Sequence, residues 1–345
     1  MISFTEDKGL DVERVLGAGG VVSQSFSGFE MRTEQVKMGK AVQEAFEGKR
    51  HLAVEAGTGV GKSFAYLVAA IDKVYRNNVK VLVSTYTITL QQQLINKDIP
   101  FLAEILGRPF TACLAKGRNN YLCRRRLEYA LRRQKGLFDE VSNELMRISE
   151  WAQQTEDGSL SDIPRTPSGN VWDAVQSEHG NCRGRKCKHF RKCFYWHARR
   201  ELKTADIIVA NHALLFSDLI LKEQSAGILP EYDFVVVDEA HNIEHVAEEH
   251  FGINISNFTF SYLLNRLYNS RTRKGVLAYG DTERARELVK NCQRAVKVFF
   301  AQIEAWYEHS KAETCGRCHS GFVDDNITEP LKALRLELGL SLIHI

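Results

Sequence analysis

The chain has 345 residues, of which 44% are hydrophobic and 26% are charged, and its formal net charge is +3. A chain of this length can form two or more domains, and the composition is that of a globular protein rather than a disordered or membrane-spanning one. The first residues, Met1–Lys8, carry acidic side chains and no long apolar run, so they do not form a secretory signal peptide. We therefore expect a cytoplasmic protein with no membrane partner.

Short apolar runs alternate with helical sequence along the first 240 or so positions. Such runs, partly β-branched and separated by helices, predict an α/β fold with a parallel sheet. Long helical periodicity follows, notably over Thr282–Tyr307, and predicts a mainly α region. The predicted strands are Leu52–Val54, Val81–Val83, Ala112–Ala115, Ile207–Ala210 and Phe234–Val237.

A glycine-rich loop follows the first apolar run and precedes helical sequence. Its glycines let the backbone N–H groups turn inward around a phosphate, and the positive end of the following helix stabilises that charge. The lysine would then reach the β and γ phosphates of a nucleoside triphosphate, and the serine after it would ligate Mg²⁺. The loop has the P-loop pattern with Ala in place of the first Gly: Ala56, Gly57, Thr58, Gly59, Val60, Gly61, Lys62 and Ser63.

The last predicted strand, Phe234–Val237, ends in the sequence Asp238, Glu239, Ala240, His241. Two adjacent carboxylates after a buried strand suit one ligand for a hard cation and one group that positions or deprotonates a water molecule. We assign Asp238 to Mg²⁺ and Glu239 to the attacking water. Together with the P-loop, this motif predicts a nucleoside triphosphate site.

Four of the eight cysteines form a second group, because thiols in a reducing compartment are more often metal ligands than disulfides. Cys123 is followed, after a long insertion, by Cys182, Cys187 and Cys193. These gaps are wide for a zinc site, and they favour an iron-sulfur cluster of the [4Fe–4S] type. Zinc, or buried cysteines without a ligand, are the alternatives.

Basic and aromatic residues surround these cysteines. Basic side chains follow a phosphate backbone while aromatic rings stack on unpaired bases, a combination typical of single-stranded nucleic-acid binding. We predict DNA contacts from Arg124, Arg185 and Tyr195. The alternative is a solvated basic face over a small aromatic core.

The order of these motifs resembles that of the iron-sulfur superfamily 2 DNA helicases, in particular the bacterial DinG/YoaA branch of the XPD-like group. The resemblance also covers Lys116–Cys123, Ala210–His212 and Phe29–Gln35, where Arg32 and Gln35 are expected near the nucleotide. Val60 stands where the family more often has Thr. A segment similar to motif Ia places Thr85, Thr87 and Gln91 near the DNA backbone, where hydroxyls and amides suit phosphate contacts.

This resemblance implies an ATP-driven motor that moves 5′ to 3′ along single-stranded DNA and opens duplexes, forks or R-loops in repair, as a monomer in its full-length form. It implies ATP, Mg²⁺ and a [4Fe–4S] cluster as cofactors, and a role for His241 in coupling the nucleotide to DNA. The implied domains are residues 1–115 and 201–245 for a RecA-like motor domain 1, 116–200 for the cluster domain and 246–345 for a partial helical arch.

The family pattern is incomplete in this chain. No Ser-Ala-Thr motif follows His241, nothing resembles the second motor domain with its arginine finger, and the apolar ending Leu338–Ile345 suggests a truncated gene model. Because an arginine finger contributes about 10³ to 10⁵ in rate, we expect the chain to bind ATP better than it hydrolyses it. The alternatives are an ATP- and DNA-binding iron-sulfur module without unwinding, and a zinc-bound ATPase.

The other four cysteines give weaker signals. Cys113 in an apolar run and Cys292 in a helix are predicted core residues. Cys315 and Cys318 are predicted to be surface thiols, with a second metal site as the alternative.

Overall fold

The computed structural model describes residues 9–25, 28, 30–133, 140–223, 227–251, 255–278 and 282–339. The chain divides into two compact units, Met1–Gly252 and Ile253–Ile345. The predicted features at Met1–Lys8, at Phe29 and in the ending after Gly339 lie outside the described residues.

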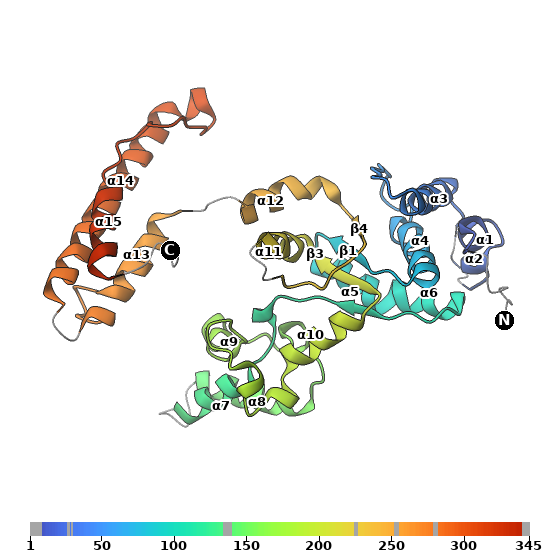
Figure 1. The fold of residues 1–345 in the computed structure, drawn as a ribbon, viewed down its shortest axis with the longest axis horizontal. Coiled ribbons are helices and arrows are strands. Elements are labelled where there is room, and N and C mark those ends of the chain that lie inside the picture. Colours follow the sequence, from blue (N-terminus) through green and yellow to red (C-terminus); the bar gives the residue numbers. More distant parts are fainter. Residues whose placement is uncertain are drawn as a thin grey trace. The chain divides into compact units, whose positions relative to one another are not determined.

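A parallel sheet of four strands, ordered β2-β3-β1-β4, lies at the centre of the first unit (Figure 1). Alternate residues of the strands face two different cores: Val81 and Val83 pack on one side, and Leu82 on the other. The predicted α/β fold with a parallel sheet is therefore confirmed. The strands are β1 (Val81–Thr85), β2 (Ala112–Leu114), β3 (Ile207–Asn211) and β4 (Phe234–Val237).

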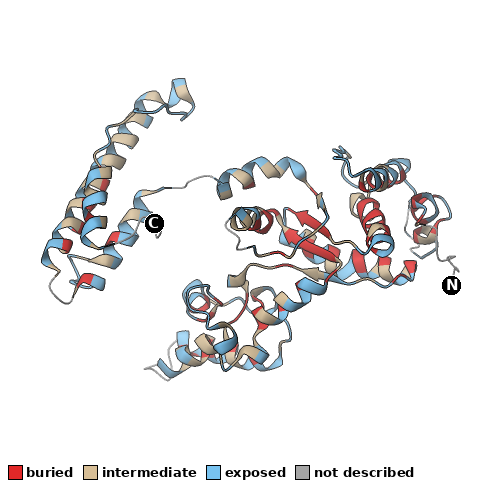
Figure 2. Ribbon diagram, viewed as in Figure 1, coloured by how far each residue is buried: buried red, intermediate tan, exposed pale blue. Residues whose placement is uncertain are grey.

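Helices cover both faces of this sheet, which is why its strands are nearly all apolar. Helix α4, which begins directly after the P-loop, is buried along most of its length against one face (Figure 2). Helix α11 packs Leu214 and Leu215 against the other. The helices around the sheet are α1 (Val12–Leu16), α2 (Val21–Ser25), α3 (Thr33–Gly48), α4 (Lys62–Asn77), α5 (Ile88–Gln93), the π-helix Leu94–Asp98, α6 (Ile99–Leu106), α11 (His212–Glu223), the 3₁₀ turn Ala240–Asn242 and α12 (Ile243–Phe251).

The predicted strand at Leu52–Val54 is wrong. These residues lie outside every strand, with Leu52 45% and Val54 42% exposed. Within the described residues, the sheet ends at β4, where Val235 is 45% exposed. A β-strand is defined by its hydrogen bonds to a neighbouring strand, and residues 52–54 form no such bonds with the sheet that the structure describes.

The segment between β2 and β3 forms an inserted region with its own hydrophobic core, in which Tyr121, Leu145, Trp172 and Tyr195 are buried. Backbone bonds from Leu122 to Gly158 and from Cys123 to Val175 connect its entry to its later loops. Its elements are α7 (Arg124–Arg133), α8 (Glu140–Gln154), α9 (Gly169–Val175), α10 (Phe194–Thr204) and the 3₁₀ turns Arg118–Asn120, Leu160–Asp162, Gly184–Lys186 and Phe190–Lys192.

The second unit is helical, and its core includes Leu264, Val289, Cys292 and Leu334. Its longest helix has 32 residues and confirms the helix predicted over Thr282–Tyr307. None of the helices in the described ranges combines the length and the apolar character needed to cross a lipid bilayer. The elements are α13 (Asn257–Leu267), the 3₁₀ turn Val276–Ala278, α14 (Glu283–Thr314) and α15 (Thr328–Glu337).

A glycine in the inserted region provides a test of its packing. Gly158 has φ +63°, and a Cβ atom there would lie 2.1 Å from the buried ring of Phe194. We expect Gly158→Ala to destabilise the region by about 2 to 4 kcal/mol, because the left-handed backbone is strained and the ring must move. Urea unfolding followed by tryptophan fluorescence measures this, since Trp151, Trp172 and Trp196 all lie in this region.

Gly107→Ala is the matched control. Its φ is +60°, but no atom lies within 4 Å of the added Cβ. It should cost only about 1 kcal/mol. Equal losses in the two variants would mean that the contact with Phe194 has no energetic weight.

Candidate nucleotide and nucleic-acid site

The P-loop turns sharply into α4 at Gly61, where φ is +84°. A Cβ atom at this position would lie 2.1 Å from Nε2 of Gln35 and would displace that side chain, and the positive φ itself favours glycine. The same Nε2 donates to the carbonyl oxygen of Gly61 at 2.9 Å. Gln35 therefore holds the loop from outside, and the loop leads into the first N–H groups of a 16-residue helix, a favourable place for an anion.

Arg32 lies beside the same loop. Its Nη1 is 3.9 Å from the point where a Cβ on Gly59 would sit, and its guanidinium is 3.6 Å from the carboxylate of Glu30. Arg32 and Gln35 were both predicted to lie near the nucleotide. The structure places Gln35 in contact with Gly61 and Arg32 next to Gly59 of the P-loop.

The carboxylates that follow β4 meet the P-loop. Nζ of Lys62 lies 3.0 Å from Oε1 of Glu239, in a partly buried ion pair. Asp238, which is 7% exposed, accepts a hydrogen bond at 3.1 Å from the hydroxyl of Tyr66. Two motifs separated by more than 170 positions are therefore in direct contact.

Tyr66 connects the two predicted ligands of Mg²⁺. Its hydroxyl interacts with the side chains of both Ser63 and Asp238. Burial, and then the charge of Asp238, raise the pKa of Tyr66 well above its usual value, so the phenol remains a hydrogen-bond donor at neutral pH. Sequence reasoning missed Tyr66, although it lies three positions after Ser63 on the same face of α4.

The backbone of Glu239 is in the left-handed region, with φ +55°. Such a conformation is uncommon for a residue other than glycine and concentrates at functional sites. Oε2 of Glu239 lies 3.5 Å from Nδ1 of His241, whose side chain is largely exposed. His241 is thus next to the predicted water-activating carboxylate and open to a partner.

His212 connects the ends of the sheet strands. Its Nδ1 is 2.7 Å from the hydroxyl of Ser84 at the end of β1, and the ring is buried. Burial lowers the pKa of His212, so the ring is neutral at physiological pH. The backbone N–H of Asp238 donates to the carbonyl of Ser84 at 2.9 Å, which ties the carboxylate motif to the same strand end.

The three residues predicted to contact the DNA backbone after β1 lie close together in the chain but differ in exposure. Thr85 is fully buried and Gln91 is buried within α5. Thr87 is exposed, and its hydroxyl caps α5 by accepting from the N–H of Leu90 at 3.2 Å. Only Thr87 presents its side chain at the surface.

The four cysteines of the inserted region line one small cavity, together with Phe190 and Trp196. Burial raises the pKa of the Cys193 thiol. In the part of the chain that the structure describes, no three His, Cys, Asp or Glu side chains are arranged to hold a single metal ion. A tetrahedral zinc site requires sulfur atoms roughly 4 Å apart, given Zn–S bonds of about 2.3 Å.

Glu128 on α7 fixes the loop that carries two of these cysteines. Its carboxylate binds Nζ of Lys188 at 2.6 Å and Nε2 of His189 at 3.0 Å. Hydrogen bonds from Lys188 and His189 lower the pKa of Glu128 to about 2. The chain between Cys187 and Cys193 is thereby attached to the helix that begins after Cys123.

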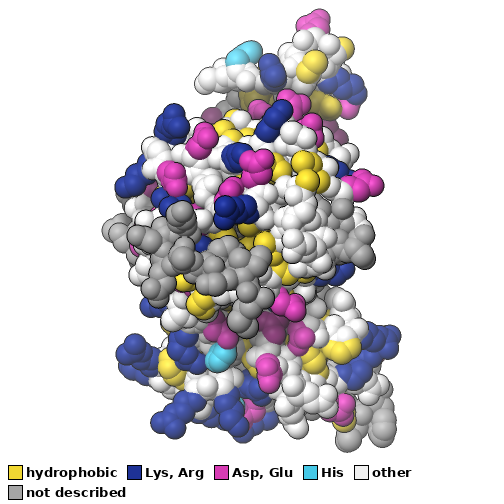
Figure 3. Space-filling view, turned by 90° about the vertical axis from the view of Figure 1, so that its right-hand side faces the viewer, with side chains coloured by type: hydrophobic (Ala, Val, Ile, Leu, Met, Phe, Trp, Pro, Cys, Tyr) yellow, Lys and Arg dark blue, Asp and Glu magenta, His cyan; other side chains and the backbone are white. Residues whose placement is uncertain are grey.

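The predicted DNA contacts in this region also differ in exposure. Tyr195 is 8% exposed, with the guanidinium of Arg118 3.9 Å from its ring centre. Arg124 lies over Phe194 at 4.3 Å and donates to the carbonyl of Lys192 at 3.0 Å. Arg185 is exposed, and Figure 3 shows Lys and Arg side chains gathered at the lower end of the face in view. The exposed cations near the cysteines are Arg183, Arg185, Lys186, Lys188, Arg191 and Lys192.

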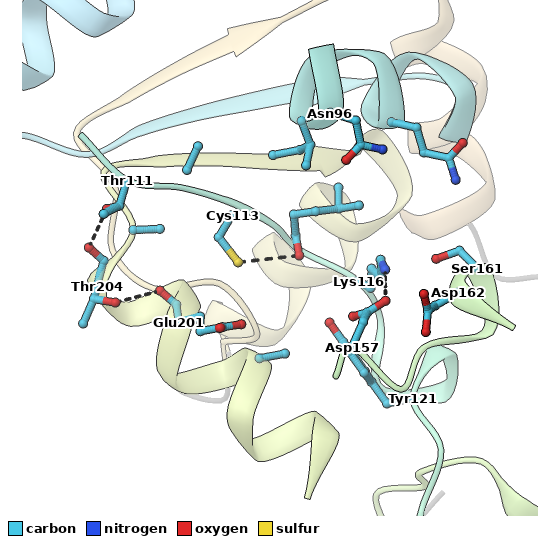
Figure 4. A pocket seen from close by; sticks show the side chains of 16 residues that line it. Asn96, Thr111, Cys113, Lys116, Tyr121, Asp157, Ser161, Asp162, Glu201 and Thr204 are labelled. Carbon is cyan, nitrogen blue, oxygen red and sulfur yellow. Dashed lines mark hydrogen bonds and ion pairs between the residues drawn. The ribbon is translucent and has the colours of Figure 1, made fainter. Parts of the chain in front are cut away.

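A larger cavity of about 580 Å³ lies between β2, α10 and the loop 157–162 (Figure 4). Lys116 and Asp157 form an ion pair at 2.8 Å in its wall. Burial raises the pKa of Cys113, which also lines the cavity, to about 11, so this thiol is not a nucleophile at neutral pH. The residues of the nucleotide site do not line this cavity.

Comparison with known proteins relates the chain to helicases. The model of the DEAD/DEAH box helicase family matches residues 38–128, and that of the DEAD_2 family matches residues 178–260. The chain is 36% identical over 239 residues to the ATP-dependent DNA helicase YoaA of Escherichia coli (strain K12), covering 69% of this chain and 37% of that protein. It is 38% identical over 231 residues to the ATP-dependent helicase DinG of Mycobacterium tuberculosis (strain ATCC 25618 / H37Rv), covering 61% and 34%.

Two further similarities are more distant. The 3'-5' exonuclease DinG of Bacillus subtilis (strain 168) is 29% identical over 295 residues, covering 85% of this chain and 30% of that protein. A solved structure of truncated XPD has a TM-score of 0.41 and 17% identity, covering 88% of this chain and 82% of that one. The chain thus spans less than two fifths of the length of the curated relatives named here.

Removing the hydroxyl of Tyr66 tests the connection between the P-loop helix and the carboxylate motif. We expect Tyr66→Phe to lose about 1.5 to 3 kcal/mol of unfolding free energy, because the buried carboxylate of Asp238 loses a donor. Urea unfolding followed by circular dichroism measures the loss. Tyr86→Phe, at an exposed tyrosine just beyond β1, should change stability by less than about 0.5 kcal/mol. Equal stability of the two variants would show that the hydrogen bond contributes nothing.

Proposed function

Because the chain is a homologue of the DinG/YoaA-type superfamily 2 helicases, we propose that it supplies the ATP-binding motor domain of an ATP-dependent DNA helicase. The observation that carries this proposal is the contact of Lys62 with Glu239 at 3.0 Å, since it joins the phosphate-binding loop to the carboxylate that would activate water. Both groups lie where the parallel strands end, the usual place for a ligand in such a sheet.

The triphosphate of ATP would lie at the start of α4, where the loop N–H groups and Lys62 meet its charge. Ser63 and Asp238 are suited to hold Mg²⁺, because Tyr66 already brings their oxygens to one hydroxyl. The bound ion would neutralise charge on the phosphates. Lys62 must leave Glu239 when it binds phosphate, and the freed carboxylate can then orient or deprotonate a water molecule.

This exchange of partners gives a test. We expect Glu239→Gln to reduce ATP hydrolysis by about 10²- to 10⁴-fold, because the general base is removed. Its affinity for ATP should equal or exceed that of the wild type, because Lys62 no longer has to leave a carboxylate. Nucleotide titration by calorimetry and a phosphate-release assay with single-stranded DNA measure the two effects.

Lys62→Ala and Lys37→Ala complete the design. Lys62→Ala should weaken ATP binding about 10- to 100-fold through loss of charge-assisted hydrogen bonds. Lys37→Ala, at an exposed position of α3, should leave the affinity for ATP unchanged. Weaker ATP binding in Glu239→Gln, or normal binding in Lys62→Ala, would contradict the proposed site.

The finer activity is also a proposal: 5′ to 3′ movement along single-stranded DNA, with opening of forks or R-loops in repair, by a protein that is monomeric in full length. The exposed cations around the cysteines support a nucleic-acid partner, and a cytoplasmic location agrees with a DNA substrate. His241 would couple the two sites. The alternative is an ATP- and DNA-binding module without unwinding, and DNA-stimulated hydrolysis by this chain separates the two.

We further propose that Cys123, Cys182, Cys187 and Cys193 hold a [4Fe–4S] cluster. Three observations support the assignment of a cluster. The four cysteine side chains line one cavity, and Glu128 fixes the loop between Cys187 and Cys193. The gaps between the cysteines in the sequence are also wide for a site that holds a single metal ion. The bound cluster would join distant parts of the inserted region and hold them at fixed positions.

Cys187→Ser tests the cluster. Protein purified without oxygen should contain iron and acid-labile sulfide in equal amounts, and the variant should lose both together with visible absorbance. Cys315→Ser, at an exposed thiol of the second unit, should keep the wild-type iron content. Stoichiometric zinc with no iron in the wild-type protein would disprove the cluster assignment.

A further inference from the structure

An exposed row of aromatic and basic side chains lies on α13 in the second unit. The rings of Phe258 and Tyr262, one helical turn apart, are stacked with centroids 6.4 Å apart and an interplanar angle of 17°. Phe258 is 75% exposed and Tyr262 is 54% exposed. The guanidinium of Arg266, a further turn along, lies 5.7 Å from the centre of the Tyr262 ring. We name Phe258, Tyr262 and Arg266 the α13 ladder.

The fold of this unit does not use the ladder. Packing is carried out by the opposite face of α13, where Leu264 is buried and Phe260 and Leu267 pack against the core. The ring of Phe260 lies 6.2 Å from that of Phe300 on α14. Two large rings that stay exposed while the described core of this unit forms without them indicate a binding surface rather than a packing requirement.

A basic turn follows α13. Its ends, Asn269 and Lys274, pair as an antiparallel bridge, and Oδ1 of Asn269 accepts from the N–H groups of Arg271 and Thr272 at 3.1 Å each. Arg273 takes the left-handed conformation with φ +52°. Arg271, Arg273 and Lys274, which we name the basic turn, are exposed and form no ion pair with any residue that the structure describes.

The charge of this stretch has one sign. Between His250 and Asp281 the sequence contains four Lys or Arg residues and no Asp or Glu. All four of these cations are exposed. Cations that form no ion pair among the described residues attract a polyanion, whereas an apolar protein partner would need only the rings.

One arginine on α14 contacts both the end of α13 and the residues just beyond the basic turn. Arg286 on α14 donates to the carbonyls of Leu277 at 2.6 Å and Ala278 at 3.0 Å, just beyond the turn. The same guanidinium lies 5.4 Å from the ring centre of Tyr268, at the end of α13. Arg286 therefore connects the end of α13, which carries the ladder, to the residues that follow the basic turn.

We propose that the α13 ladder and the basic turn form a binding site for single-stranded nucleic acid, with bases stacked on Phe258 and Tyr262 and phosphates bound by the basic turn. Every base has a π-face, so such stacking is independent of sequence, and the guanidinium of Arg266 adds a cation–π contact. The inference deepens the proposed function, on which it rests for its ligand, by assigning a contact outside the motor and the cysteine region.

The site is tested by measuring the affinity of the full chain for a thymidine 20-mer in the absence of ATP. The comparison ligand is a sugar-phosphate backbone of equal length that carries no bases. The double variant Phe258→Ala/Tyr262→Ala should bind the thymidine 20-mer at least about tenfold more weakly, because neither ring can stack on a base. Its affinity for the base-free backbone should stay at the wild-type value. Arg271→Ala/Arg273→Ala should instead weaken both ligands and lower the slope of log affinity against log salt by about 0.7 for each phosphate that an arginine no longer neutralises.

Tyr307→Ala is the matched control. This tyrosine of α14 is also exposed and has Nζ of Lys311 5.8 Å from its ring centre, but Glu308 binds the same lysine at 2.6 Å. It should leave both affinities unchanged. Photocross-linking of an oligonucleotide that carries 5-bromouracil should label α13 at Phe258 or Tyr262, which gives a local readout independent of the cysteine region.

Unchanged affinity and no label on α13 would overturn the inference, and so would an equal loss in Tyr307→Ala. These outcomes are distinct from failure of the proposed function. Binding is measured without ATP, so a chain that binds and labels as expected but neither binds nor hydrolyses ATP would refute the motor alone. A working ATPase with no contact at α13 would refute the ladder alone.

Discussion

The parallel register of β1 with its two neighbours is the constraint on which the candidate site depends. Ser84 pairs with Ala210 of β3 and Val237 of β4, so the three strands end at the same level. Parallel strands present their carboxyl ends at one edge of a sheet, and segments far apart in sequence meet there. The bonds of Ser84 to His212 and to the N–H of Asp238 extend this register beyond the strands and into the motifs.

This arrangement fixes most of the candidate nucleotide site in the absence of a ligand. Tyr66 already joins Ser63 to Asp238, and the positive φ of Glu239 directs the chain away from β4 immediately after the carboxylates. In the proposed function the ion pair of Lys62 with Glu239 opens when phosphate binds, and because both side chains are partly exposed, this opening requires little free energy. The site therefore requires the movement of side chains rather than of the sheet.

The sequence motifs predicted which segments meet at this site better than they predicted the local structure. The P-loop and the Asp-Glu-Ala-His sequence are recognised by residue type, so Lys62 and Glu239 could be assigned to one site from sequence, although their ion pair was not predicted. The strand predicted at Leu52–Val54 failed because an apolar run becomes a strand only beside a partner, and the neighbour is a long-range property. Tyr66 was missed because an aromatic residue in a buried helix looks like a core residue until its hydroxyl is seen to reach a carboxylate.

Basic residues interleaved with aromatic ones have two structural outcomes in this chain, and exposure distinguishes them. Near the cysteines, Arg118 and Arg124 cover Tyr195 and Phe194, and these rings are buried in the core of the inserted region. On α13 the guanidinium of Arg266 also approaches a ring, yet both rings of the ladder stay in solvent because another face of the helix makes the core. A cation over a buried ring stabilises the fold, whereas a cation over an exposed ring leaves a π-face available to a base. Composition alone cannot separate these cases, since burial depends on which helix face the rest of the unit covers.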